Sequence, residues 1–224
     1  MLVFILTLIV KTFASWSGGK DSCLALYKAL KDGIDVKLLL NTVTEDGMYS
    51  RSHGVRAEVL RKQAEALGIE LLQIRTSWEN YEENFLQTLL KLRELGFSQG
   101  IFGDIDLEEH RQWIERVCER AKIIPYLPLW KMEREKVVRE FIHSGFRAVV
   151  CSVKDGILGR EWLGKEIDMK FIEEMKKRSV DVCGENGEFH TFVYDGPIFK
   201  KRLKLNFGEI KSKDKYSFIE IYVT

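Results

Sequence analysis

The stretch Ser17–Ser22, which reads SGGKDS, decides the fold that this sequence predicts. The apolar run Phe13–Trp16 leads into it, and the amphipathic segment Cys23–Leu30 follows it. A strand, a glycine turn and a helix start direct free backbone N–H groups at an anion. Gly18 and Gly19 allow the backbone to approach a phosphate without a Cβ in the way. The sequence therefore predicts a phosphate-binding loop between a first strand and a first helix.

The other side chains of this loop suit a nucleotide. The hydroxyls of Ser17 and Ser22 can donate hydrogen bonds to phosphate oxygens, Lys20 supplies positive charge, and Asp21 is a candidate ligand for Mg²⁺. The spacing differs from the GxxxxGK[ST] loop of P-loop NTPases, and an acid follows the lysine. A glycine turn without a ligand is the alternative interpretation.

A repeating pattern of helix, glycine and apolar run extends the fold outward from this loop. Helix-like stretches end at glycines, which commonly stop helices in a left-handed conformation. These glycines are Gly33, Gly68, Gly96 and Gly145, and the runs that follow are Val36–Val43, Ile69–Ile74, Phe97–Ile105 and Phe146–Val153. Uninterrupted runs of strand length are typical of strands covered on both faces. We expect an α/β fold with a doubly wound, mostly parallel sheet, which binds ligands beyond the carboxyl ends of its strands.

The pattern changes after about Ser152, where glycines become frequent. A short helix is expected over Ile167–Lys177, and two strands over Leu203–Ile210 and Tyr216–Val223. We therefore divide the chain into a nucleotide-binding domain of residues 1–152 and a smaller α+β substrate-binding region of residues 153–224. Many residues of the tail are basic. They form either a solvated hairpin or a docking face for an acidic partner or RNA. They are Lys200, Lys201, Arg202, Lys204, Lys211, Lys213 and Lys215.

The composition limits the class of protein. The 224 residues are 45% hydrophobic and 31% charged, which is typical of a globular chain, and the net charge of +1 does not indicate stable binding to nucleic acid. The four cysteines form no CxxC pair, so a zinc ribbon has no support and a reducing cytoplasm is expected. The apolar first ten residues are shorter than the roughly 20 residues that span a bilayer. We interpret them as a stub and a first buried strand; a secreted protein is the alternative.

Two resemblances sharpen the function. The SGGKDS loop resembles that of the N-type ATP pyrophosphatases, which have a HUP-like fold and cleave ATP between its α and β phosphates. The tail motif GENGEFHT at Gly184–Thr191, with Asp195–Pro197 after it, resembles the diphthine–ammonia ligase family. The same holds for the short stretches Leu158–Arg160, Trp162–Gly164 and Ile167–Asp168 and for the FGDI stretch Phe102–Ile105. The resemblance covers nearly the whole chain. It implies a ligase that uses ATP and ammonium to amidate the diphthine carboxylate of translation elongation factor 2, through an adenylate, releasing AMP and pyrophosphate.

The resemblance also implies roles for single residues. Glu185 and Glu188 would bind the trimethylammonium group of diphthine or take a proton from ammonium, and His190 would orient either partner. A solvated turn is the alternative for both glutamates. The candidate catalytic residues are Lys20, Asp21, Asp104, Glu185 and Glu188.

Further nucleotide contacts are expected around the strand ends. Backbone groups near Thr42 would read the adenine, and His53 either faces the nucleotide or lies in a surface loop. Gly103 and Asp104 follow a strand, where ligands bind in this fold, although Asp104 is also a candidate helix N-cap. His110 and His143 are interpreted as structural.

Three other functions remain open. A tRNA-modifying ATP pyrophosphatase would bind RNA in a salt-sensitive way. An enzyme forming a small-molecule amide would need no protein substrate, and a nucleotide sensor would bind without catalysis. No cysteine lies in a nucleophile elbow, so free ammonium is the expected nitrogen donor rather than glutamine.

Overall fold

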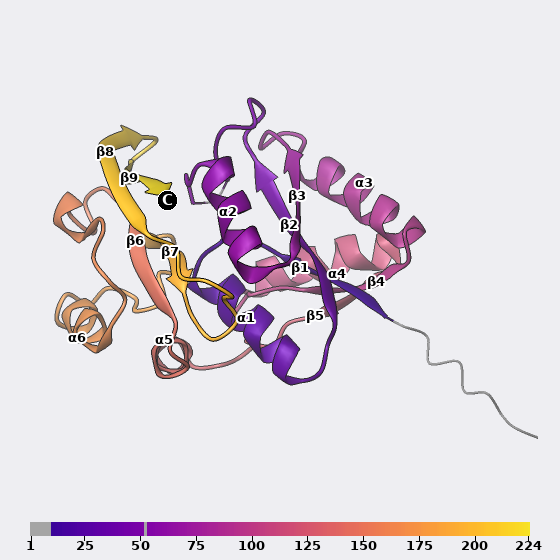
Figure 1. Cartoon of the computed structure of the whole chain (residues 1–224), viewed down its shortest axis with the longest axis horizontal. Coiled ribbons are helices and arrows are strands. Elements are labelled where there is room, and N and C mark those ends of the chain that lie inside the picture. The colour runs from indigo at the N-terminus through magenta and orange to yellow at the C-terminus, as the bar shows by residue number, and fades with distance from the viewer. Residues whose placement is uncertain (1–9, 52) are drawn as a thin grey trace, which may run out of the picture.

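The computed structural model describes residues 10–51 and 53–224, which form two sheets with helices around them (Figure 1). The strand expected within the first ten residues falls on residues 1–9, outside the described residues, apart from Val10. Val10 is an exposed residue of no regular structure, and the first strand begins at Lys11. Within the described ranges no helix is both long enough and apolar enough to cross a membrane.

The first sheet is entirely parallel. Its strands lie in the order β3-β2-β1-β4-β5. They are β1 (Lys11–Ser15), β2 (Val36–Val43), β3 (Glu70–Arg75), β4 (Phe97–Ile101) and β5 (Ile124–Tyr126). The strand order reverses between β1 and β4, and a ligand crevice is expected at such a switch point. The loop Ser17–Ser22 begins two residues beyond the end of β1.

Helices cover both faces of this sheet, so the predicted doubly wound α/β fold is confirmed. The helices α1 (Lys20–Lys31) and α2 (Ala57–Leu67) pack on one face, and α3 (Tyr81–Glu94) and α4 (Glu108–Ala121) on the other. The four glycines expected to end helices all have positive φ, between +72° and +88°. This conformation costs little without a Cβ, which explains why the helices end there.

The second sheet is antiparallel, with the strand order β7-β6-β9-β8. Its strands are β6 (Arg147–Lys154), β7 (Phe189–Asp195), β8 (Leu205–Lys213) and β9 (Tyr216–Val223), and α5 (Arg134–His143), a 3₁₀ turn (Arg160–Trp162) and α6 (Met169–Lys177) accompany them. The run Phe146–Val153 was expected in the parallel sheet, and this was wrong. It lies largely in β6, which is buried on both faces. A strand buried on both faces has an apolar sequence in a parallel and in an antiparallel sheet alike, so the run alone does not distinguish them. The chain thus passes to the second sheet upstream of the expected division at residue 152.

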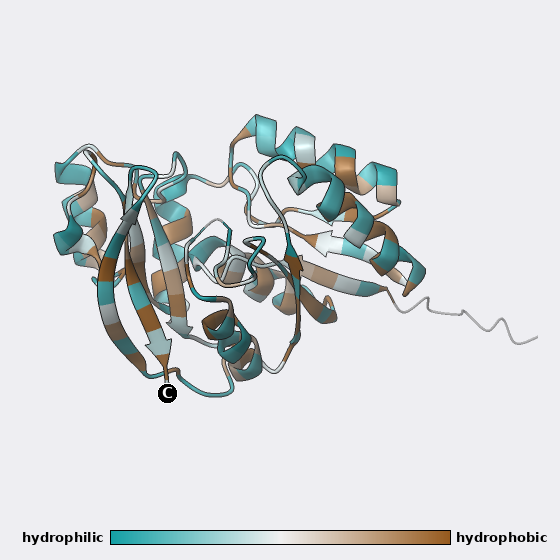
Figure 2. Ribbon diagram, turned by 90° about the horizontal axis from the view of Figure 1, so that it is seen from above, coloured by the Kyte–Doolittle hydropathy of each residue, from teal (hydrophilic) through white to brown (hydrophobic). Residues whose placement is uncertain are grey.

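Helix α2 lies between the two sheets and joins their cores. Val59 and Leu60 pack with Phe192 of β7 in one apolar cluster, whereas Ala64 and Leu67 belong to the cluster around α1. Apolar and polar segments accordingly alternate along the helices and strands (Figure 2).

One polar side chain is buried at this junction. Gln63 of α2 is fully buried, and its Oε1 accepts a hydrogen bond from Trp16 Nε1 at 2.9 Å. Its Nε2 donates to the carbonyl of Gly18 at 3.0 Å and to that of Val193 at 2.6 Å. A single amide therefore connects the end of β1, the glycine loop and β7.

Replacing Gln63 with leucine should destabilise the fold by roughly 2–4 kcal/mol, because it leaves a buried indole N–H and two buried carbonyls without this partner. The free energy of unfolding from urea titration measures the effect. The control is Gln87→Leu, which changes an exposed glutamine of α3. Equal stability of the two variants would contradict the role given to Gln63.

Candidate active site

The loop Ser17–Ser22 leaves no room for a side chain at either of its two glycines. Gly18 has a φ of +79°, and a Cβ there would lie 2.4 Å from Leu60 Cδ2. A Cβ on Gly19 would lie 2.5 Å from His53 Cε1. The backbone is thus packed tightly against α2 at Gly18 and against His53 at Gly19, which forms the N-cap of α1. This is the strand–turn–helix arrangement expected of an anion-binding loop.

The two serines stabilise the turn. Ser17 Oγ accepts a hydrogen bond from the Gly19 N–H at 3.2 Å and lies 3.2 Å from Ser22 Oγ. Ser22 Oγ donates to the Gly19 carbonyl at 3.0 Å. Both hydroxyls therefore lie at the start of α1, where phosphate oxygens would be bound.

Strand β7 closes over this loop. The Val193 N–H donates to the Gly18 carbonyl at 3.0 Å, and the Lys20 N–H donates to Thr191 Oγ1 at 3.0 Å. Thr191 belongs to the tail motif, but no role was predicted for it. The phosphate loop and the tail motif, 171 residues apart at these two positions, are thus in direct contact.

The buried Lys20 forms an ion pair with the partly buried Asp21 beside the loop. Lys20 Nζ donates to Asp21 Oδ2 at 2.8 Å and to the carbonyl of Cys183. Burial alone would lower the pKa of Lys20, but the charges of Asp21 and Glu185 raise it above its usual range. Burial raises the pKa of Asp21, although Lys20 opposes this shift. Its Oδ1 is buried without a hydrogen-bond partner.

The segment 181–188 is held in place by an arginine. Asp181 accepts hydrogen bonds from the backbone N–H groups of Cys183 and Glu185, at 3.0 and 2.9 Å. Arg134, at the start of α5, donates to Asp181 at 2.6 Å and to both oxygens of Asp106 at 2.8 Å. Arg134 therefore connects this segment to the turn after β4. Nothing in the sequence alone pairs Arg134 with these two acids.

The two glutamates of the tail motif differ in their surroundings. Glu188 is buried, and its oxygens accept hydrogen bonds from the backbone and side-chain N–H groups of Asn186, both at 3.0 Å. Burial raises the pKa of Glu185 to about 7, with a further rise from the charge of Asp21, whereas Lys20 lowers it. Glu188 thus stabilises the turn, and Glu185 is the glutamate near the phosphate loop.

Gly103 and Asp104 lie at the end of β4, against the phosphate loop. A Cβ on Gly103 would lie 2.9 Å from the carbonyl carbon of Asp21, so glycine is needed for the two segments to pack. Asp104 does not cap α4, whose N-cap is Leu107. Its Oδ1 lies instead 3.2 Å from His110 Nδ1.

Two histidines stack beside the loop. The rings of His53 and His190 lie 4.6 Å apart, and the ring of Tyr216 follows at 6.0 Å from His190. His53 Nδ1 is 3.0 Å from the Thr191 carbonyl, which therefore accepts a hydrogen bond from an Nδ1–H tautomer. Burial lowers the pKa of His53 to about 4 and moves the pKa of His190 well below its usual value, so both rings are neutral at pH 7.

Thr42 lines a small recess at the ends of β1 and β2. The recess has a volume of about 50 Å³, and its other walls include Ser17, Asn41 and Tyr81. The Thr42 carbonyl already accepts a hydrogen bond from the Arg51 N–H at 3.0 Å. Thr42 thus lies beside the phosphate loop, as an adenine contact requires. Its carbonyl, however, is already paired with the N–H of Arg51.

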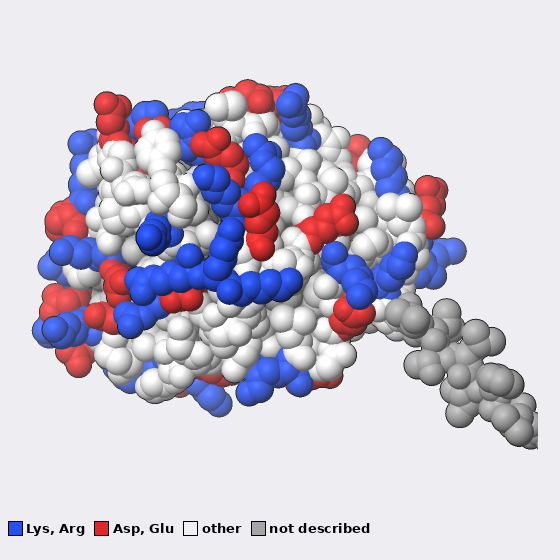
Figure 3. All heavy atoms as spheres, in the orientation of Figure 1, with Lys and Arg blue, Asp and Glu red and all other residues white. Residues whose placement is uncertain are grey.

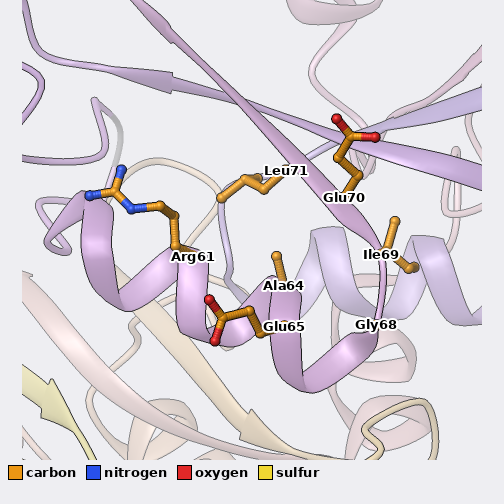
Figure 4. Close-up of a pocket in the computed structure, with 7 residues that line it drawn as sticks. All are labelled: Arg61, Ala64, Glu65, Gly68, Ile69, Glu70 and Leu71. Carbon is orange, nitrogen blue, oxygen red and sulfur yellow. The ribbon is translucent and has the colours of Figure 1, made fainter.

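Two other surface features lie away from this site. A recess of about 290 Å³ between α2 and β3 is lined by Arg61, Glu65 and Leu71, among others, and by no predicted site residue (Figure 4). The basic residues of the tail form no single face. Lys200 contacts α2 near Gly68, whereas Lys211–Lys215 lie at the far end of β8, roughly 25 Å along the strand. Figure 3 shows Lys and Arg interspersed with acidic residues on the viewed face.

Comparison with known proteins matches the two halves of the chain to one family. Residues 10–124 match the Diphthamide synthase N-terminal domain, and residues 133–223 match the Diphthamide synthase C-terminal domain.

Relatives named diphthine–ammonia ligase share much of the sequence. The Rattus norvegicus protein is 30% identical over 90% of this chain and 85% of its own length, and the Homo sapiens protein is 30% identical over 87% and 82%. A solved structure described as a predicted subunit of tRNA methyltransferase from Methanocaldococcus jannaschii is 18% identical, with a TM-score of 0.47 over 86% of this chain and 99% of that one. The predicted resemblance is confirmed by the two matched domains and these relatives, and the chain belongs to the diphthamide synthase family of ligases.

Proposed function

We propose that this protein uses ATP and ammonium to amidate the carboxylate of diphthine on translation elongation factor 2, through an adenylated carboxylate. The observation that carries the proposal is the contact of Lys20 in the phosphate loop with Thr191 of the tail motif and with Cys183, the residue before that motif. A residue bound at the tail motif would lie next to a nucleotide bound at the loop. We assign nucleotide binding to the first sheet and substrate binding to the second.

The loop residues suit adenylation. A carboxylate is a poor electrophile at neutral pH, and transfer of AMP converts it into a mixed anhydride with a good leaving group. Lys20 and the N-terminus of α1 would stabilise the negative charge that develops on the departing pyrophosphate. Ser17 and Ser22 would bind its oxygens, and the recess beside Thr42 would accept part of the adenosine.

The residues present fit a Mg²⁺ ion that arrives with ATP. Asp21 offers one buried oxygen without a partner. Within the described residues no cluster of three His, Cys, Asp or Glu side chains forms a metal cage. Mg²⁺ commonly binds through one or two carboxylates together with substrate phosphates. Bound there, it would neutralise phosphate charge.

The second sheet would hold the acceptor. We assign Glu185 to the binding of a cation, either ammonium or the trimethylammonium group of diphthine, because its carboxylate lies near the phosphate loop. Glu188 shapes the turn that presents it, and the neutral rings of His53 and His190 line the adjacent wall. Since elongation factor 2 acts in translation, we place the reaction in the cytoplasm, without stable binding to nucleic acid.

The direct test incubates the protein with Mg·ATP, ammonium and elongation factor 2 bearing diphthine, and follows AMP together with the mass of the factor. We expect AMP and the mass change from carboxylate to amide. AMP without amidation would move the search for the acceptor to tRNA or small carboxylates. Tight ATP binding without AMP would indicate a sensor.

Replacing Asp21 with asparagine should lower the rate of AMP formation by about 10²–10³-fold, because a charged group that acts on the phosphates is lost. ATP affinity should change much less. The control is Asp35→Asn, which changes an exposed acid after α1. Single-turnover AMP release and calorimetric ATP titration measure the two effects, and a variant that differs from wild type in affinity alone would refute catalysis at Asp21.

The raised pKa of Glu185 predicts a pH dependence of stability. The pKa rises from an ordinary 4.5 to about 7, so the folded protein binds more protons than the unfolded chain between these values. The contribution of Glu185 to stability is therefore full below pH 4.5 and is lost as the pH rises to about 7. Above pH 7 the carboxylate is ionised and suited to binding a cation.

Denaturant titrations of wild type and Glu185→Gln between pH 4.5 and 8 test this shift. The stability of wild type relative to the variant should fall across the window, because glutamine does not titrate. Glu173→Gln, at an exposed position on α6, is the matched control and should run parallel to wild type. A wild-type curve parallel to that of Glu185→Gln would contradict the shift.

A further inference from the structure

His110 has surroundings that a structural helix residue does not need. It is the third residue of α4, its side chain is 59% exposed, and its Nδ1 lies 3.2 Å from Asp104 Oδ1. A carboxylate beside Nδ1 accepts the proton of that nitrogen, which assigns the lone pair of the neutral ring to Nε2. The ring is therefore held in one tautomer, with its basic nitrogen directed away from Asp104.

The pair lies at the proposed site of reaction. Gly103, the residue before Asp104, packs against the backbone of Asp21 and Ser22. The carboxylate of Asp104 also raises the pKa of both Asp21 and Glu185, so its charge acts on both sides of the site. The chain thus places an acid–imidazole pair beside both the phosphate loop and the cation-binding glutamate.

We propose, on the basis of the proposed function, that Asp104 and His110 form a catalytic dyad in which His110 Nε2 removes a proton from ammonium. The proton moves to Nε2, and the freed lone pair of ammonia forms the C–N bond to the carbonyl carbon of the adenylated carboxylate. The bond between that carbon and the AMP phosphate oxygen breaks, and AMP leaves with the electron pair. The nitrogen loses a second proton to water as the amide forms.

The charges around His110 agree with this role. The hydrogen bond to Asp104 raises the pKa of His110, burial opposes the rise, and the charges of Asp104, Glu185 and Glu109 add to it. All three acids, from the turn after β4, the segment 181–188 and α4 itself, stabilise the protonated ring. The imidazolium formed by proton transfer is thus favoured, and the exposed edge of the ring can return the proton to solvent.

The test compares two nucleophiles. Ammonium must lose a proton before it attacks, whereas hydroxylamine is already neutral at pH 7. With Mg·ATP and elongation factor 2 bearing diphthine, His110→Gln should form the amide at least about 10²-fold more slowly than wild type at pH 7, which is the usual contribution of a general base. It should form the hydroxamate within about 3-fold of the wild-type rate, and its pyrophosphate burst should be unchanged.

The pH profile gives a second measurement. The amidation defect of His110→Gln should shrink in alkaline buffer, where free ammonia replaces ammonium. His143→Gln, at an exposed position at the end of α5, is the matched control and should match wild type with both nucleophiles.

Two results would overturn the dyad while leaving the proposed function intact: an unchanged amidation rate in His110→Gln, or an equal loss of amide, hydroxamate and pyrophosphate burst. A wild-type protein that forms no pyrophosphate burst would overturn the proposed function and the dyad together.

Discussion

The hydrogen bonds of the Gln63 amide are the constraint on which the site depends. They hold the end of β1, the glycine loop and β7 at one point, in an interior where a missing partner would be costly. Since Gly18 is packed against Leu60 and Gln63 of α2 without room for a side chain, the conformation of the loop at Gly18 depends on the position of that helix. Helix α2 thus contacts the phosphate loop on one side and the second sheet on the other.

The parallel sheet was predictable from local signals. Uninterrupted apolar runs and helix-ending glycines report local conformation and burial, and β2 was predicted with its observed bounds Val36–Val43. The second sheet was harder to predict, because the sequence of an apolar run that is buried on both faces does not identify the strands beside it. β6 was therefore assigned to the wrong sheet. β7 was not predicted as a strand, because its first residues belong to the tail motif, which was chosen for its glycines and acidic residues.

The candidate site shows the same division. Residues within a contiguous motif, such as Lys20 and Asp21, could be chosen as candidates from the sequence because their residue types and spacing suit phosphate binding. Thr191, Arg134 and Gln63 could not, since their importance comes from hydrogen bonds between segments far apart in the chain. The pairing of Asp104 with His110 spans only six residues, yet a turn between β4 and α4 brings them together, and sequence spacing alone does not show that turn.

The hydrogen bond from Lys20 to the Cys183 carbonyl has a thermodynamic consequence. The ammonium group donates one hydrogen bond to Asp21 and one to the carbonyl of Cys183, which precedes the tail motif. A phosphate oxygen bound at the loop would compete with these two partners for the position of the same ammonium group. The binding of a phosphate at the loop and the conformation of the segment 181–188 would therefore depend on each other. Linkage is reciprocal, so an acceptor that changes nucleotide affinity by a given factor has its own affinity changed by the same factor. In the proposed reaction, a single lysine side chain would couple the binding of the nucleotide to the binding of the acceptor.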